Sequence, residues 1–101
     1  MKGEKCIPVL KALGELNRMR IMHLLLNDEL GSTTVASRLG ISEYNVSKHL
    51  RILKEAGLLQ MQKAGKERLY SVAPDFKDQL KENRHVLELG CCSFRFDRLP
   101  R

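Results

Sequence analysis

Three cysteines carry the most distinctive chemistry in this sequence of 101 residues. Cys91 and Cys92 are adjacent, and Cys6 lies near the opposite end of the chain. A thiolate binds soft metal and metalloid ions, and it is also the form of cysteine that oxidants attack. Adjacent Cα atoms are about 3.8 Å apart, closer than an unstrained disulfide usually allows. We therefore expect no bridge between Cys91 and Cys92, so that the three thiols either bind a ligand or fill space as small apolar groups.

The segment around residues 42–51 carries a second chemically distinctive group of side chains. Its hydroxyl, amide and cationic groups are of the kinds that contact base edges and phosphates when a helix enters the major groove of DNA. The backbone amides at the helix starts near Thr33 and Ser42 would also bind phosphates, because unpaired N–H groups and the helix dipole favour anions. We expect Asn45 to contact base edges. The candidate DNA-contacting residues here are Thr33, Ser42, Tyr44, Asn45, Ser47, Lys48, His49 and Arg51.

Three helices are expected before this segment. Pro8 suits the first turn of a helix that ends near residues 14–16. Asn17 is expected to cap a second helix, whose many apolar residues indicate a place in the core. Ser32 or Thr33 can cap a short third helix, which Gly40 would end in a left-handed conformation. A three-residue turn then leads directly into the next helix.

The fourth helix and the hairpin after it position the polar segment. Ser42 is expected to cap this helix, and residues 56–57 are expected to end it. Its predicted inner face consists of Val46, Leu50, Ile52 and Leu53. Strands over 58–63 and 67–72 flank a turn at 64–66 and predict a β-hairpin. Its cations Lys63, Lys66 and Arg68 suit the DNA backbone or minor groove beside the helix.

A last helix is expected to begin at Pro74 and to continue towards Leu89. Gly90 would end it just before the adjacent cysteines, freeing their side chains from helical geometry so that both could approach one ion. The tail from Ser93 to Arg101 has no clear regular structure.

The order helix, turn, helix and basic hairpin predicts a winged helix-turn-helix. We expect a mainly α fold with about five helices and a two-stranded wing, and a single domain over residues 1–101. Its core would cover about residues 8–89, with a cysteine-bearing tail over 90–101. Burial against a second copy would stabilise so short a chain, which favours a homodimer.

Charge and hydropathy agree with this prediction. Lys and Arg number 18 against 12 Asp and Glu, a formal charge of +6 and a sequence pI near 9.5. Such an excess suits a phosphate-rich partner. No apolar run approaches the ~20 residues that span a bilayer, and the first residues are not followed by a signal-type segment. We expect a cytoplasmic, non-enzymatic protein with double-stranded operator DNA as its partner, no membrane and no small organic substrate.

Several segments resemble the ArsR/SmtB family of metal-sensing repressors over about residues 8–89. They are residues 12–14, 18–21, 45–53, 56–58 and 69–70, and the most specific is the run Val-Ser-Lys-His-Leu followed eight positions on by Ala-Gly-Leu. The resemblance implies a homodimer formed largely by the first and last helices. It also implies operator binding without inducer, and release when a metal or metalloid binds.

The metal sites of the family are not retained at their usual positions. Gly31 and Thr33 stand where arsenic sensors often carry Cys-Val-Cys, and of the zinc-type motif only His85 and Glu88 remain. The family architecture would bring Cys6 near Cys91 and Cys92. Three thiolates without a fourth ligand suit trivalent arsenic or antimony better than tetrahedral zinc. We therefore expect As(III) or Sb(III) as the inducer.

Other triggers and other classes stay open. The same fold could sense oxidants through a reversible bridge from Cys6 to the tail. A DNA-binding protein that responds to no ligand is a further alternative. A thiol enzyme is not supported, because the sequence has no Cys-x-x-Cys motif, phosphate loop or Cys-His arrangement.

Overall fold

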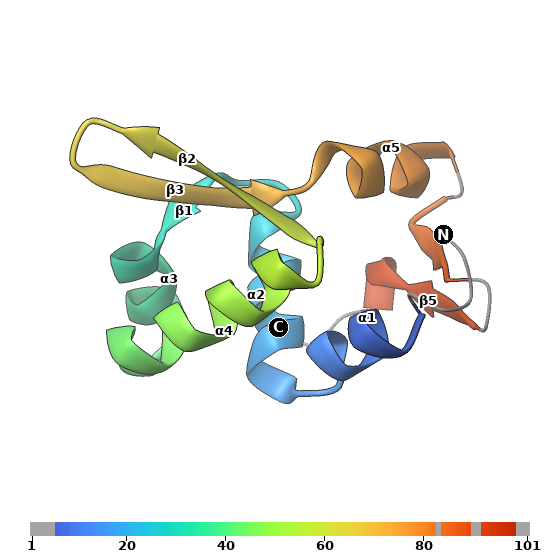
Figure 1. The fold of residues 1–101 in the computed structure, drawn as a ribbon, viewed down its shortest axis with the longest axis horizontal. Helices are drawn as coiled ribbons and strands as arrows, with labels where there is room; N and C mark the ends of the chain where they lie inside the picture. Colours follow the sequence, from blue (N-terminus) through green and yellow to red (C-terminus); the bar gives the residue numbers. More distant parts are fainter. Residues whose placement is uncertain (1–5, 83, 90–91, 99–101) are drawn as a thin grey trace.

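The computed structural model describes residues 6–82, 84–89 and 92–98. Five α-helices and a three-stranded antiparallel sheet form the larger part, and a second two-stranded hairpin follows the last helix (Figure 1). The helices are α1 (Cys6–Leu13), α2 (Leu16–Leu25), α3 (Ser32–Leu39), α4 (Glu43–Glu55) and α5 (Pro74–Glu82). The strands are β1 (Leu30–Gly31), β2 (Leu59–Ala64), β3 (Glu67–Val72), β4 (Val86–Glu88) and β5 (Ser93–Arg95), and the 3-10 helix η2 (Phe96–Arg98) follows. The expected mainly α winged helix-turn-helix is confirmed.

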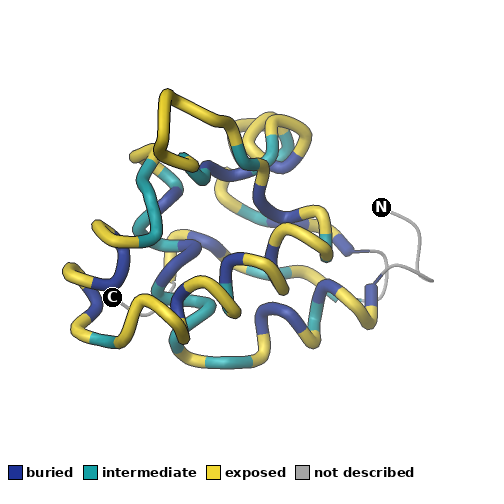
Figure 2. Tube along the Cα trace, turned by 60° about the vertical axis from the view of Figure 1, so that its left-hand side comes forward, coloured by how far each residue is buried: buried dark blue, intermediate teal, exposed yellow. Residues whose placement is uncertain are grey.

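One apolar core joins the helices to both hairpins. On the helices, buried residues face the interior and exposed residues face outward (Figure 2). Ile21, Met22 and Leu25 of α2 are completely buried, as expected for the central helix. The inner face of α4 consists of Val46, Leu50 and Leu53, all with 0% exposure. Ile52, which we had placed on that face, is 37% exposed, because it lies about 100° around the helix from Leu53.

Two helix starts differ from the predictions. Glu15, and not Asn17, caps α2: its carboxylate accepts a hydrogen bond of 2.9 Å from the Arg18 amide. Gly31 occupies the cap position of α3, so Ser32 and Thr33 lie within the first turn instead of capping it. In both helices the chain becomes helical earlier than the polar residues suggested, because caps depend on backbone geometry as well as on residue type.

The wing is a regular antiparallel pair, with β2 and β3 in register from Leu59 opposite Val72 to Ala64 opposite Glu67. Gly65 and Lys66 form its two-residue turn, and Gly65 has φ +65°, a left-handed conformation that glycine adopts without strain. The short strand β1 adds a third strand beside β3, so the sheet has one strand more than the two-stranded wing expected.

The predictions for the chain after α5 were wrong. The helix ends at Glu82 instead of continuing towards Leu89, and Arg84 and His85 have φ values of 54° and 68°, outside the helical region. The His85 amide closes the helix end with a hydrogen bond of 2.7 Å to the Leu80 carbonyl. The chain then forms β4, which pairs with β5, so part of the supposedly irregular tail is regular structure.

Burial explains the second hairpin. Leu87 and Leu89 are buried while Glu88 is exposed, which is the period of two typical of a strand with one face on the core. Phe96 follows β5 and is also buried, with its amide bonded to the His85 carbonyl at 2.8 Å. None of the described helices is long and apolar enough to cross a membrane.

Candidate nucleic-acid interface

The turn between α3 and α4 has the three residues expected from the sequence. Gly40 ends α3 with φ +70°, and its amide donates to the Ala36 carbonyl at 2.9 Å. Ser42 begins the next helix, because its hydroxyl oxygen accepts a hydrogen bond of 3.1 Å from the Asn45 amide. Both predictions about the turn are confirmed, and together they present the start of α4 to solvent.

The outer face of α4 is exposed and polar. Tyr44, Asn45, Ser47 and Lys48 are all exposed, and Tyr44 is 72% exposed despite its size. The Lys48 ammonium lies 5.4 Å from the centre of the Tyr44 ring, within the range of a cation–π contact. Among the described residues, the Asn45 side chain has no hydrogen-bond partner, so its amide is available to base edges.

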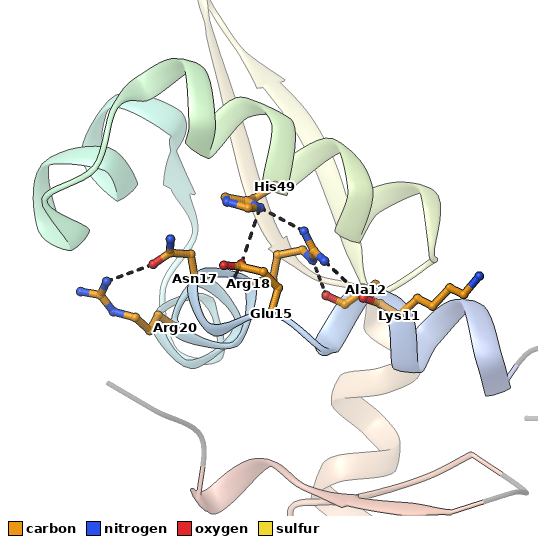
Figure 3. Close-up of polar contacts among 7 residues, drawn as sticks. All are labelled: Lys11, Ala12, Glu15, Asn17, Arg18, Arg20 and His49. Carbon is orange, nitrogen blue, oxygen red and sulfur yellow. Dashed lines mark hydrogen bonds and ion pairs between the residues drawn. The ribbon is translucent and has the colours of Figure 1, made fainter.

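His49 lies on a different side of α4 from these residues. Its ring faces α1 and α2 (Figure 3). Its Nδ1 lies 3.2 Å from Arg18 Nη1 and 3.8 Å from Glu15 Oε2. Only 18% of the His49 side chain is exposed. The structure therefore does not bring His49 together with the exposed DNA-facing candidates.

Two arginines of α2 connect the helix-turn-helix to its support, and Figure 3 shows the contacts of Arg18 with the end of α1 and with His49. Arg18 donates from Nε to the Ala12 carbonyl and from Nη2 to the Lys11 carbonyl at 3.2 Å, which satisfies the end of α1. Arg20 donates to the Leu39 carbonyl near the end of α3 at 3.2 Å. Together with the contact between Arg18 and His49, these bonds hold α3 and α4 at defined positions relative to α1 and α2.

Glu15 completes this network as a carboxylate. Its partial burial favours the neutral acid, but hydrogen bonds from the Arg18 and Asn17 amides and favourable electrostatic interactions with His49 and Arg18 outweigh that cost. The pKa of Glu15 is consequently lowered from its ordinary 4.5. Near neutral pH the residue is ionised, and it caps α2 while facing the His49 ring.

A hollow of about 550 Å³ lies between α3, α4 and the wing. Its cationic side chains come from two elements: Arg51 and Lys54 from α4, and Lys66 and Arg68 from the wing. Four cations against two carboxylates leave this surface positive, which suits a phosphate backbone that passes between helix and wing.

Glu43, one of these two carboxylates, is the first residue of α4 and contacts the first turn of α3. Glu43 Oε1 accepts hydrogen bonds from Ser32 Oγ at 3.2 Å and from Thr33 Oγ1 at 3.1 Å. The Thr33 hydroxyl, a candidate phosphate contact, is thus directed at a carboxylate. A phosphate would have to replace Glu43 as its acceptor.

The hollow includes some of the candidate residues and not others. It is lined by Thr33, Ser47, Arg51, Lys66 and Arg68, whereas Ser42, Tyr44, Asn45, Lys48 and Lys63 lie outside it on exposed surface. Sequence reasoning missed Lys54, which also lines the hollow. The spacing 47, 51 and 54 places these three residues on one face of a helix, and this signal was available in the sequence.

The structure describes two of the three predicted cysteine ligands, Cys6 and Cys92. Cys6 is completely buried at the start of α1 and is disulfide-bonded. Cys92 is half-buried, and its carbonyl accepts a hydrogen bond of 2.9 Å from the Leu89 amide between β4 and β5. It lies in a hairpin loop, and not just after a helix as predicted. Cys91 falls outside the described residues, and within the described ranges no group of three or more His, Cys, Asp or Glu side chains could hold a metal ion.

The fold and this surface together define a winged helix-turn-helix regulator of transcription. A model described as a helix-turn-helix domain matches residues 13–62. A cadmium resistance regulatory protein CadC homolog from Staphylococcus aureus is 37% identical, over 81% of this chain and 73% of that protein. The chain belongs to the ArsR/SmtB family of transcriptional regulators.

Two further relatives are similar in sequence and in structure. The transcriptional activator HlyU of Vibrio cholerae is 32% identical over 68% of this chain, and the match spans 64% of its length. The structure of reduced HlyU has a TM-score of 0.68 and 29% identity, over 78% of this chain and 84% of that one. The homodimeric winged helix-turn-helix DNA-binding domain Mb0332 of Mycobacterium bovis, described as a possible ArsR-family regulator, has a TM-score of 0.71 and 26% identity, over 80% and 75%.

Proposed function

We propose that this chain is a cytoplasmic, homodimeric repressor that binds double-stranded operator DNA and releases it when its cysteines react. The start of α4 enters the major groove, and Asn45 contacts base edges. Lys66 and Arg68 of the wing contact phosphates, with Arg51 and Lys54 lining the surface between. The homodimeric DNA-binding domain Mb0332, which has the same fold, supports two copies acting on two half-sites about one DNA turn apart.

We infer that a change in thiol oxidation is the trigger, and the disulfide at Cys6 carries this inference. Oxidation would join Cys6 to a cysteine of the tail: two thiols give up two electrons and two protons, and one hydrogen peroxide takes them up to form two waters. Because Cys6 is buried on α1, opening or closing this bond changes how α1 is held against the rest of the core. Similarity to HlyU, whose structure was solved in a reduced form, is in keeping with this trigger.

Trivalent arsenic or antimony is the second candidate trigger. Cys6, Cys91 and Cys92 would supply three thiolates, which suits a pyramidal metalloid ion. The similarity to a cadmium resistance regulator favours a thiophilic effector of this kind. Metalloid binding requires Cys6 as a free thiol, whereas the redox trigger forms a disulfide at Cys6. The two triggers therefore require different oxidation states of this residue.

A titration of the protein–DNA complex separates the candidates. Peroxide and arsenite are each added to the reduced protein on operator DNA, and release is followed by fluorescence anisotropy. A redox regulator releases DNA with peroxide, recovers with dithiothreitol, and loses the response on Cys6→Ser. An arsenic sensor releases DNA with arsenite and loses that response in the Cys91→Ser, Cys92→Ser double variant, because a hydroxyl does not replace a thiolate on a soft ion. If neither reagent changes the affinity for operator DNA, both triggers are wrong. The remaining alternative is then a DNA-binding protein that responds to no ligand.

A further inference from the structure

A second cavity lies far from the wing, between the end of α2, α5 and the segment around η2. Its volume is about 440 Å³, within the range of small-molecule sites in proteins. In Figure 1, α5 and the β4–β5 hairpin lie at the opposite end of the molecule from the tip of the wing. The cavity is therefore separate from the DNA-facing hollow.

The lining of this cavity combines apolar and cationic side chains. Leu26, which is half-buried, contributes accessible apolar surface, whereas Leu80 and Phe96 are only 4% and 1% exposed. Lys77 and Lys81 stand one helical turn apart on α5, so both are directed to the same side of the helix. His23 and His85 add two imidazoles from α2 and from the turn after α5.

The charges of the lining are not balanced. Its carboxylate, Asp97, is already paired with Arg95 through bonds of 2.8 and 3.2 Å. Within the described part of the chain, neither Lys77 nor Lys81 lies within 4.0 Å of a carboxylate oxygen. Two ammonium groups therefore face a concave, partly apolar space with no carboxylate of their own.

We propose that this cavity binds a small organic anion with an apolar body, such as an aromatic or medium-chain carboxylate. The anionic group would lie between Lys77 and Lys81, and the body would pack against Leu26. The apolar part of the lining distinguishes this ligand from inorganic phosphate, which has no apolar surface to bury. The proposal goes beyond the cysteine chemistry, and it concerns binding that is measured in the absence of DNA.

The test uses 2-naphthoate as the probe, added to the full chain and followed by calorimetry and by amide chemical shifts. The neutral amide of the same acid has the same apolar body without the charge, and inorganic phosphate has charge without the body. We expect 2-naphthoate to bind at least tenfold more tightly than either, with shifts concentrated at His23, Lys77 and Lys81.

Substitution locates the site. The Lys77→Gln, Lys81→Gln double variant should bind 2-naphthoate at least tenfold more weakly, while Lys11→Gln, which removes an exposed lysine from α1, should bind as the unaltered chain does. The substituted lysines are exposed, and circular dichroism checks that the fold is retained. Equal binding of the acid, its amide and phosphate would overturn the proposal, and so would a double variant that binds no more weakly than Lys11→Gln.

Discussion

The described part of the chain contains two antiparallel hairpins, one with an exposed tip and one packed against the core. The wing has six-residue strands and a two-residue turn, and residues 62–68 around its tip are all exposed. The β4–β5 hairpin has three-residue strands, and Leu87, Leu89 and Phe96 anchor it in the core. The wing can therefore change its surface chemistry at little cost in stability, whereas a chemical change near the second hairpin is coupled to core packing. Cys92, which lies between β4 and β5 and packs against the core, is where a reaction of the kind proposed above would affect core packing.

The largest expected effect tests this contrast through stability. Leu87→Ala, which removes a completely buried side chain, should lower the free energy of unfolding by about 2–5 kcal/mol, because it leaves a cavity in the core. Gln62→Ala on the exposed wing is the control, with an expected change within about 0.5 kcal/mol. Urea denaturation measures both. Similar losses for the two variants would show that the second hairpin is no more part of the core than the wing.

The next effect concerns DNA and separates helix from wing. Asn45→Ala should cost about 1–3 kcal/mol at a specific operator and relax the base preference, because it removes a contact to base edges. Lys66→Ala should weaken binding to all sequences alike and reduce the salt slope by about 1, because it removes a phosphate contact. Binding to specific and random duplexes at several salt concentrations distinguishes the two. The assignment fails if both variants lose specific and non-specific affinity equally.

A smaller effect is expected at the start of the recognition helix. Ser42→Ala removes the side-chain oxygen that accepts from the Asn45 amide, and should lower the free energy of unfolding by about 1 kcal/mol. Ser37→Ala, at an exposed position inside α3, is the matched control and should change stability by less. Thermal or urea unfolding measures both variants, and an unchanged midpoint for Ser42→Ala would contradict its role as a cap.

The smallest effect is a pH dependence that compares the cap of α2 with the segment after the second hairpin. The folded-state pKa of Glu15 is below its ordinary 4.5, so its stabilisation is complete above about pH 4.5 and is lost as the pH falls through the lower, folded-state value. Glu15→Gln should therefore flatten part of the acid-induced loss of stability, measured from pH 7 to pH 3. Asp97, whose pKa is also lowered by its hydrogen bond with Arg95, is exposed, so Asp97→Asn should flatten it less. An acid dependence that is unchanged in Glu15→Gln would contradict the network around α2.

The fold was predictable where its signals are local. Ser42, Gly40 and residues 56–57 mark the ends of helices by their own conformational preferences, and the structure has these ends as expected. The candidate DNA-facing residues followed from the same local logic, and most of them are exposed on α4 or on the wing. His49 is the exception, because its partners Arg18 and Glu15 are more than thirty residues away in sequence.

The second hairpin shows where this logic ends. Leu87, Glu88 and Leu89 continue a pattern that helix and strand share over so short a run, and three residues do not decide between periods of 3.6 and 2. Pairing with residues 93–95 and burial of Leu87, Leu89 and Phe96 decided it, and the core in which they are buried is built mainly by helices far away in sequence. The lysines and imidazoles of the second cavity are likewise brought together only by folding, because α2, α5 and the segment after β5 are far apart along the chain.

The sequence by itself determined the family, the order of the helices and the wing, and the side chains at the start of α4, because caps, turn residues and apolar periods act over a few residues. Only the tertiary structure decided that residues 86–88 and 93–95 form a hairpin held in the core, that His49 faces Arg18 and Glu15, and that cations gather in a hollow beside the wing and in a second cavity. Each of these depends on which distant surfaces exclude water from one another, and that free energy belongs to the packed core as a whole.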